Sequence, residues 1–245
     1  MPLAIEPTTT RNGSVFGPSA TTVADAALML DVLAGGTAWR DPKDPAGPLR
    51  VAISTKSPSP IGRPDEAARR AVALAADLAR EAGHRVSEAD PPYPLTLANL
   101  WVRRWLAGIA TDVEQLGLDV SALEPRTRAM VIKGRRLLRR GRPRPDDATA
   151  WLDRLASWFD SYDVLISPTI ARPAPPMGWA TDVGFARAYL NGARGVPYTQ
   201  AWNVSGYPAL SLPVGEHPGA VQIVAPPQAE ATILSVARQL EAARR

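Results

Sequence analysis

The sequence predicts a soluble α/β fold, and three observations support this. A strand, a helix and a second strand follow one another within residues 49–89. Three helical patterns fill the middle of the chain, and short apolar strand patterns return in its last third. Because two strands joined through a helix pair in parallel, the first segment implies an α/β sheet. We expect residues 1–245 to form one domain or a large piece of one.

The first elements have clear start and stop signals. A helix is expected to begin after Thr21 or Thr22, which can cap it, and to end at Gly35-Gly36. Residues 49–54 alternate as a strand does. Pro64 then opens an Ala-rich helix that ends near Gly83, and a second strand follows over residues 84–88. This βαβ unit spans residues 49–89.

The rest of the chain divides into a helical part and a strand-and-loop part. Helices are expected over residues 95–116, 123–140 and 146–159, which together form a helical insertion at 95–160. Residues 163–245 are expected to hold pocket loops, strands and the last helix. The strands there cover 163–167, 209–214 and 220–224, the proline-rich stretch 170–177 is an extended loop, and the last helix covers 228–245.

Composition excludes several classes of protein. The 245 residues include no cysteine, so there is no disulfide framework and no thiolate nucleophile or metal ligand. A secretory signal and a bilayer-length apolar run are both missing, so we expect a cytoplasmic protein with no membrane partner. The net charge is +4, and nine basic residues without an acidic one lie between Arg126 and Arg144. A solvated helix face is the favoured explanation, and nucleic-acid binding the least favoured.

No catalytic centre is visible in the residues themselves. The Gly-x-Ser-x-Gly elbow of the α/β-hydrolases does not occur, and His84 and His217 both lie in turn-like contexts. There is no metal-ligand spacing, no phosphate-binding loop and no dinucleotide fingerprint. We therefore assign no catalytic residue, no metal and no cofactor.

Three segments, in order, resemble the amidase-signature family. The first resembles its Gly-Pro-x-Ala-Arg-Thr-Val-x-Asp-Ala-Ala helix, with Thr21 in place of the Arg. The second resembles its Pro-Thr … Pro-Ala-Pro stretch, and the third its Asn-x-(Ser/Thr)-Gly-x-Pro-Ala strand entry. They are Phe16-Gly17-Pro18-Ser19-Ala20-Thr21-Thr22-Val23-Ala24-Asp25-Ala26-Ala27, Asp163-Val164-Leu165-Ile166-Ser167-Pro168-Thr169 with Pro173-Ala174-Pro175, and Asn203-Val204-Ser205-Gly206-Tyr207-Pro208-Ala209 with Gln222 and Glu230.

The resemblance implies a mixed β-sheet wrapped by helices, here the C-terminal part of an amidase-signature fold. It also implies hydrolysis of a carboxamide through a serine acyl-enzyme. The family's nucleophilic Ser, its bridging Ser and its Lys base belong to a signature region that no residue of this sequence matches. We therefore expect the chain to be inactive by itself, and poorly soluble because sheet edges and apolar faces would be exposed.

Three residues are candidates for substrate binding. Trp202 and Asn203 precede a strand, where pocket-lining loops usually lie, and Thr169 opens the proline-rich loop. Asn203 could instead hold its own loop through backbone hydrogen bonds, and the proline loop could be simple packing. The expected partner is a small-molecule amide, provided that the N-terminal half is supplied.

Two alternatives stay open on function. The chain could be a non-catalytic remnant that binds a ligand or a partner, or a basic nucleic-acid-binding protein. The oligomeric state also stays open, a homo-oligomer included. If the protein is an enzyme, the residues do not distinguish a small acylamide, an aryl or peptide amide, and a tRNA-linked glutaminyl amide.

Overall fold

The computed structural model describes residues 17–141, 143–181, 183–215 and 219–243. His217, Arg142, the start of the first family-like segment and the last two residues lie outside these ranges. Eight α-helices and five strands are assigned within them. The strands are β1 (Arg50–Ile53), β2 (Arg85–Glu88), β3 (Val164–Pro168), β4 (Ala209–Pro213) and β5 (Ala220–Val224).

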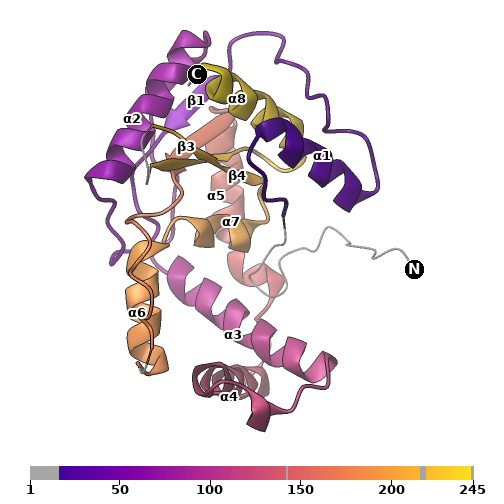
Figure 1. Ribbon diagram of the computed structural model, residues 1–245, viewed down its shortest axis with the longest axis vertical. Coiled ribbons are helices and arrows are strands. Elements are labelled where there is room, and N and C mark those ends of the chain that lie inside the picture. Colours follow the sequence, from indigo (N-terminus) through magenta and orange to yellow (C-terminus); the bar gives the residue numbers. More distant parts are fainter. Residues whose placement is uncertain (1–16, 142, 182, 216–218, 244–245) are drawn as a thin grey trace.

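The helices come in the order shown in Figure 1, with two short 3-10 turns among them. They are α1 (Val23–Ala34), α2 (Glu66–Glu81), α3 (Leu97–Gln115), α4 (Pro125–Arg139), α5 (Thr149–Phe159), α6 (Phe185–Gly195), α7 (Thr199–Ser205) and α8 (Glu230–Ala243), with the turns at Val120–Ala122 and Pro145–Ala148.

The five strands form one mixed sheet in the order β2-β1-β3-β5-β4. β1 pairs in parallel with β2, as predicted, and in parallel with β3 on its other side. β5 runs antiparallel to both β3 and β4. Consequently β1, β2, β3 and β4 all point the same way, and their carboxyl ends meet at one edge of the sheet. The α/β class and the mixed sheet expected from the sequence are both confirmed.

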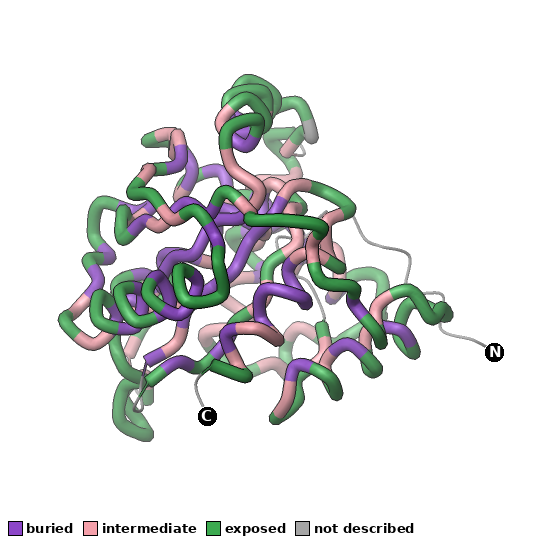
Figure 2. Tube along the Cα trace, turned by 90° about the horizontal axis from the view of Figure 1, so that it is seen from above, coloured by how far each residue is buried: buried purple, intermediate pink, exposed green. Residues whose placement is uncertain are grey.

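Two apolar clusters bury the two faces of the sheet. On one face, side chains of α1, α2 and α8 pack on strand residues such as Val51, Ile166 and Ile223. On the other face, α3, α5 and α7 pack on Ala52, Leu165 and Val224. Because successive strand residues point to opposite faces, Leu165 and Ile166 belong to different clusters. Figure 2 shows the buried stretches gathered in the middle of the trace.

Local signals explain where the helices begin and end. Thr22 caps α1 by accepting a hydrogen bond from the Asp25 N–H, and Gly35 ends it with a left-handed φ of 69°. Asp65 caps α2 in the same way, through the Ala68 N–H at 2.9 Å. α4 crosses α3 so closely at Gly134 that an added Cβ would meet the Leu106 carbonyl oxygen at 2.0 Å.

The segment before β4 differs from the expectation. Residues 199–205, expected to form a loop, are the helix α7, and α6 lies in a stretch for which no helix was expected. The proline-rich residues 170–177 contain no helix or strand, as predicted. β4 lies at an edge of the sheet, and the apolar side chains of Leu28, Met29 and Val32 on α1 are exposed.

Candidate functional site

Polar side chains cluster near the carboxyl ends of the strands, on the face covered by α3, α5 and α7. Leu165 and Val224 point to that face, so Ser167 and Gln222, two residues away, point to it as well. Ser211 of β4 is paired with Gln222, and Ser167 with Gln222 on its other side. We call Ser54, Ser167, Thr169, Ser211 and Gln222 the polar belt.

Some groups of the polar belt are paired and others are not. Ser54 Oγ donates to Asp90 Oδ1 at 2.6 Å, and the hydroxyls of Thr169 and Ser211 lie 2.9 Å apart. Ser167 Oγ and Gln222 Nε2 are buried without a hydrogen-bond partner in the described chain. Buried polar groups in native proteins are nearly always paired with protein, water or ligand. The belt therefore has unused hydrogen-bonding capacity.

The location of the belt suits ligand binding. In open α/β sheets, ligands bind beyond the carboxyl ends of the strands, where neighbouring strands connect in opposite directions. The chain runs from β1 to β2 through α2, which covers one face of the sheet. It enters β3 from α5, which covers the other face, so β1 and β3 have their connecting helices on opposite faces. The belt lies at this edge.

Helix α7 forms the wall next to the belt. The Tyr198 hydroxyl donates to the Thr55 carbonyl oxygen at 2.7 Å, and burial raises the pKa of that phenol, so it remains a donor at neutral pH. Arg104 of α3 donates to the Val204 carbonyl oxygen at 3.0 Å and ties α3 to the end of α7. The short helix is thus fixed at both ends.

The three predicted binding residues have different surroundings. Thr169 directly follows β3 and contacts Ser211 across the belt. Trp202 is 3% exposed and packs edge-on against Tyr93, with ring centroids 6.2 Å apart. Its indole N–H is buried without a partner in the described chain. Asn203, the next residue of α7, is half-buried.

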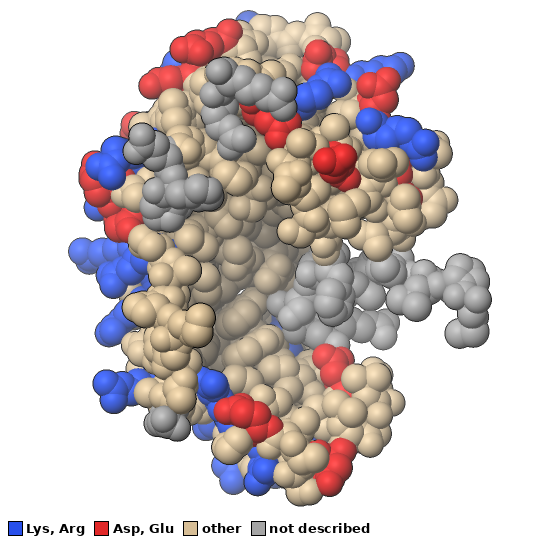
Figure 3. All heavy atoms as spheres, viewed as in Figure 1, with Lys and Arg blue, Asp and Glu red and all other residues tan. Residues whose placement is uncertain are grey.

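A cavity of about 260 Å³ adjoins this wall. Its lining comes from α3, α4, α6, residues 179–180 and the start of α7. Gln200 of α7 is the lining residue nearest in sequence to Trp202, and it is 3% exposed with an Oε1 that has no partner in the described chain. Figure 3 shows the hollowed face of the molecule, on which the visible walls between the charged rims are mostly uncharged.

Sequence reasoning missed most of this cavity. Its aromatic walls include Trp101, Trp105, Phe185 and Tyr189, and none of these was proposed as a binding residue. One signal was present: each helix carries its two aromatic residues four positions apart, which places them on one helix face. The sequence could not show that the two helices face each other.

The described residues contain no serine–histidine pair suited to catalysis. His84 Nδ1 accepts from the Leu49 N–H at 3.2 Å, and its Nε2 lies 2.8 Å from Gln239 Oε1. Both ring nitrogens are therefore engaged in structural hydrogen-bond contacts, one with the residue before β1 and one with α8. No cluster of three metal-ligating side chains occurs within the described ranges, and no helix there is long and apolar enough to cross a membrane.

Part of the basic run on α4 also has structural contacts. Arg126 donates to the Ala180 carbonyl oxygen at 2.9 Å, and Arg128 to the carbonyl oxygens of Ser121 and Leu123. Lys133 Nζ lies 5.3 Å from the centre of the Phe185 ring. A nucleic-acid-binding surface needs cations that contact phosphates, and these three side chains are already engaged within the protein.

Solved structures share this fold. The structure of 6-aminohexanoate cyclic dimer hydrolase, in complex with its substrate, matches with a TM-score of 0.71 and 26% identity, over 92% of this chain and 54% of that one. A structure described as an amidase shares the fold, with a TM-score of 0.69 at 20% identity, over 94% of this chain and 52% of that one.

Sequence comparison identifies the family. The amidase family model matches residues 9–234, and the chain belongs to this family. It is 35% identical to "Putative amidase AmiB2" of Mycobacterium tuberculosis over 94% of its length, which is 52% of that relative. It is 32% identical to "Putative amidase AmiA2" of the same organism, over 94% of this chain and 51% of that one. The chain thus spans about half the length of the curated relatives it matches.

Proposed function

We propose that this chain forms the substrate-binding wall of an amide hydrolase that works through a serine acyl-enzyme. In such a reaction a serine oxygen attacks the amide carbonyl, the C–N bond breaks and the amine leaves with a proton. Water then cleaves the ester and releases the carboxylic acid. The nucleophilic Ser, the bridging Ser and the Lys base would come from residues outside this sequence, as the family resemblance implies.

One observation carries the proposal: the polar belt with its unpaired buried groups. Ser167 Oγ and Gln222 Nε2 are buried at the sheet edge where α/β proteins bind ligands. A substrate amide offers both a donor and an acceptor, so it is able to use such groups. In the alternative, a non-catalytic remnant, the same residues would bind a ligand or a partner and no amide would be hydrolysed.

Within this wall, we assign substrate contacts to Thr169, Trp202 and Asn203. Thr169 supplies a hydroxyl at the carboxyl end of β3. Trp202 supplies a buried indole N–H, and Asn203 a half-buried carboxamide on the same helix. The substrate is a small amide, and the protein acts in the cytoplasm.

The test compares two purified proteins. One is the chain alone, and the other is the chain fused behind the half of the M. tuberculosis relative that the match does not cover. Release of amine from simple amides is measured for both. We expect turnover only by the fused protein, lowered about tenfold or more by Thr169→Val because a substrate-facing hydroxyl is lost.

A matched control uses Ser57→Ala, since the Ser57 hydroxyl donates to the Ser59 carbonyl oxygen within its own loop. This variant should keep the turnover of the fused protein. Turnover by the chain alone would place a nucleophile within these residues and overturn the proposal. A folded fusion that releases no amine from any amide would favour the non-catalytic alternative.

A further inference from the structure

The cavity next to α7 has the composition of a site for a flat ring. We infer that it binds a neutral aromatic group of one or two rings whose attached N–H donates to Gln200, so that the preferred substrates are aryl amides. This inference rests on the proposed function for the hydrolysis step only. Binding of the ring can be measured without any turnover.

Size and shape limit the ligand first. The cavity holds about 260 Å³, which is slightly below the ~300–1,000 Å³ usual for small-molecule sites. A compact ring system fits this volume, and a long peptide or polymer does not. The cavity lies between α3 and α6, and α4, residues 179–180, Val196 and Gln200 line the rest of it.

The walls are aromatic on two sides. Trp101 and Trp105 of α3 stack with ring centroids 5.2 Å apart and planes 13° apart. Phe185 and Tyr189 of α6 are nearly parallel as well, at 6.1 Å and 18°. Rings of this kind favour flat, polarisable partners over bulky saturated ones.

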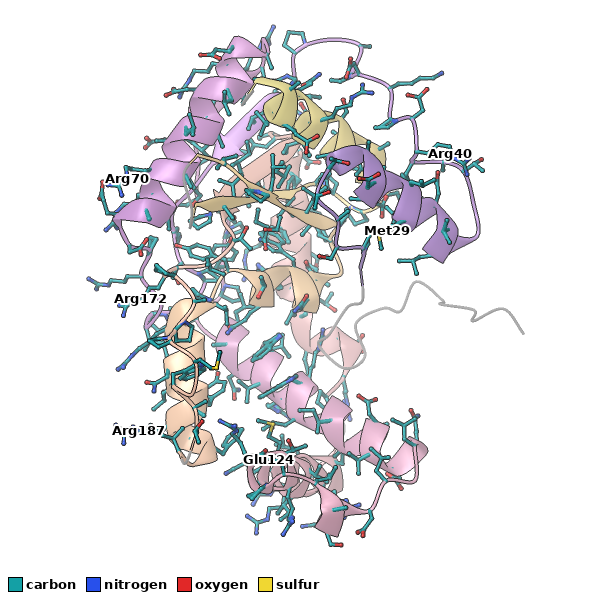
Figure 4. All side chains as sticks on the ribbon, in the orientation of Figure 1. Met29, Arg40, Arg70, Glu124, Arg172 and Arg187 are labelled. Carbon is teal, nitrogen blue, oxygen red and sulfur yellow. The ribbon has the colours of Figure 1, made fainter. Side chains whose placement is uncertain are left out.

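Charge selects a neutral ligand. Aromatic faces also attract cations, but Lys133 already lies over the Phe185 ring, so a cationic ligand would be repelled there. Arg126 also lines the cavity. The charge of Arg126 is in turn balanced by Glu124, whose Oε1 is 3.7 Å from it, so this guanidinium is not free to pair with an anion. Glu124 lies at the start of α4, and Arg187 projects from α6 away from α3 and α4 (Figure 4).

Hydrogen bonding orients the ligand. Gln200 Oε1 is buried with no partner in the described chain, and the side chain lines the cavity. Its terminal bond rotates readily, which lets the oxygen turn towards a ligand. An N–H attached to the ring satisfies this acceptor. Gln200 belongs to the same short helix α7 as Trp202 and Asn203, the two residues of that helix assigned above to substrate contacts.

The experiment uses three probes that differ by one feature each. Acetanilide has the ring and the N–H, N-methylacetanilide lacks the N–H, and N-cyclohexylacetamide lacks the aromatic ring. Binding to the purified chain is followed by ligand-observed NMR and calorimetric titration. We expect acetanilide to bind about fivefold to tenfold more tightly than either analogue, from one hydrogen bond or one aromatic contact.

Variants assign the binding to this cavity. Ala188→Trp fills the cavity from α6 and should abolish binding of all three probes. Gln200→Met removes the acceptor at similar length, so acetanilide should weaken to the level of N-methylacetanilide, whose own affinity stays unchanged. Arg187→Ala, on the adjacent residue, should change nothing. Circular dichroism and urea unfolding check that each variant is folded.

Several outcomes would overturn the inference: equal binding of acetanilide and N-cyclohexylacetamide, binding that persists in folded Ala188→Trp, or no binding by the wild-type chain. If Ala188→Trp fails to fold, the Gln200→Met comparison decides. The fused protein separates the two proposals. Acetanilide that binds to a fused protein which hydrolyses no amide contradicts the hydrolase, whereas hydrolysis of amides without preference for the aryl probe contradicts the pocket.

Discussion

The two faces of the sheet differ in how far their buried polar groups are hydrogen-bonded. On the face covered by α1, α2 and α8, Asp31, His84 and Ser235 are all buried and all paired. On the opposite face and in the helices that cover it, polar atoms of Ser167 and Gln222 are buried without partners in the described chain. The same is true of the side-chain atoms of Trp101, Trp151, Gln200 and Trp202.

This difference separates a structural face from a binding face. An unpaired buried donor or acceptor costs about 1–3 kcal/mol, so a chain keeps one where water, a ligand or other protein groups complete it. Asp31 is an example of a buried group with its hydrogen-bond partners, because its carboxylate accepts from the N–H groups of Trp39 and Arg40. In the polar belt, Ser54 is paired with Asp90 in the same way, whereas Ser167 Oγ and Gln222 Nε2 lack such partners in the described chain.

The largest expected effect comes from breaking the helical wall of the cavity. In Gly134→Ala, the new methyl group would meet the Leu106 carbonyl oxygen at 2.0 Å and the Ala110 Cβ at 2.8 Å. Because a backbone atom cannot move aside, α3 and α4 must separate. We expect a loss of at least the ~1–3 kcal/mol typical of overpacked sites, measured by urea unfolding.

Gly195→Ala, at the end of α6, is the control for that variant, because nothing lies within 4 Å of its added Cβ. It should leave the unfolding free energy nearly unchanged. The cavity probes should bind Gly134→Ala weakly and Gly195→Ala normally. Equal stability of the two variants would show that α3 and α4 do not pack as described.

A pair of buried serines tests the comparison of the two faces directly. Ser235 Oγ donates to Asp44 at 3.0 Å, whereas Ser167 Oγ has no partner in the described chain, and both residues are fully buried. Ser235→Ala should therefore cost about 0.5–1.5 kcal/mol. Ser167→Ala removes an unsatisfied group and should leave the unfolding free energy unchanged or raise it by about 1 kcal/mol.

Thermal and urea unfolding of the two variants, under identical conditions, give the result. If Ser167→Ala is as destabilising as Ser235→Ala, the hydroxyl has a partner and the faces do not differ in this respect. In the fused protein, Ser167→Ala should still lower turnover, because the hydroxyl would then be missing from the site.

The strands and the long helices could be predicted because their signals are local. Val164, Leu165 and Ile166 form an apolar run that a proline ends, and caps such as Asp65 mark the helix starts. The polar end of β3 was also readable, since Ser167 and Thr169 follow the apolar run directly. The family resemblance then supplied the mixed arrangement of the sheet.

Helices α6 and α7 escaped prediction because their sequence carries opposing signals. Gly192 and Gly195 lie within α6, and Pro197 separates the two helices. Glycine and proline disfavour helix interiors, so tertiary packing decides here. The cavity was unpredictable for a further reason: its walls, α3 and α6, are far apart in the chain and meet only in the folded protein.

The smallest expected effect lies at the amino ends of the strands, far from the polar belt. Arg50, at the start of β1, donates to both oxygens of Asp163, at 3.2 Å through Nε and 2.7 Å through Nη2, and to the Asp160 carbonyl oxygen. The hydrogen bond from Arg50 holds the pKa of Asp163 below its usual value despite some desolvation. The folded protein therefore favours the ionised carboxylate more than the unfolded chain does.

The sign of the pH dependence follows from that lowered pKa. The stabilisation is fully present above the unfolded pKa of about 3.9, and it is lost as the pH falls through the lower folded value. Because the pair is partly exposed, its contribution should be only ~0–1 kcal/mol. Urea unfolding of wild type and Asp163→Asn should differ at pH 7, and the difference should shrink as the pH falls below the unfolded pKa of about 3.9.

A second variant of this ion pair separates charge from geometry. Arg50→Lys keeps the charge without the two-pronged contact, and a loss equal to that of Asp163→Asn would show that geometry matters as much as charge. Neither variant should change binding of the cavity probes, because the pair lies at the opposite ends of the strands from the polar belt. If either did, the two ends of the sheet would be coupled, and the belt could not be treated as a separate site.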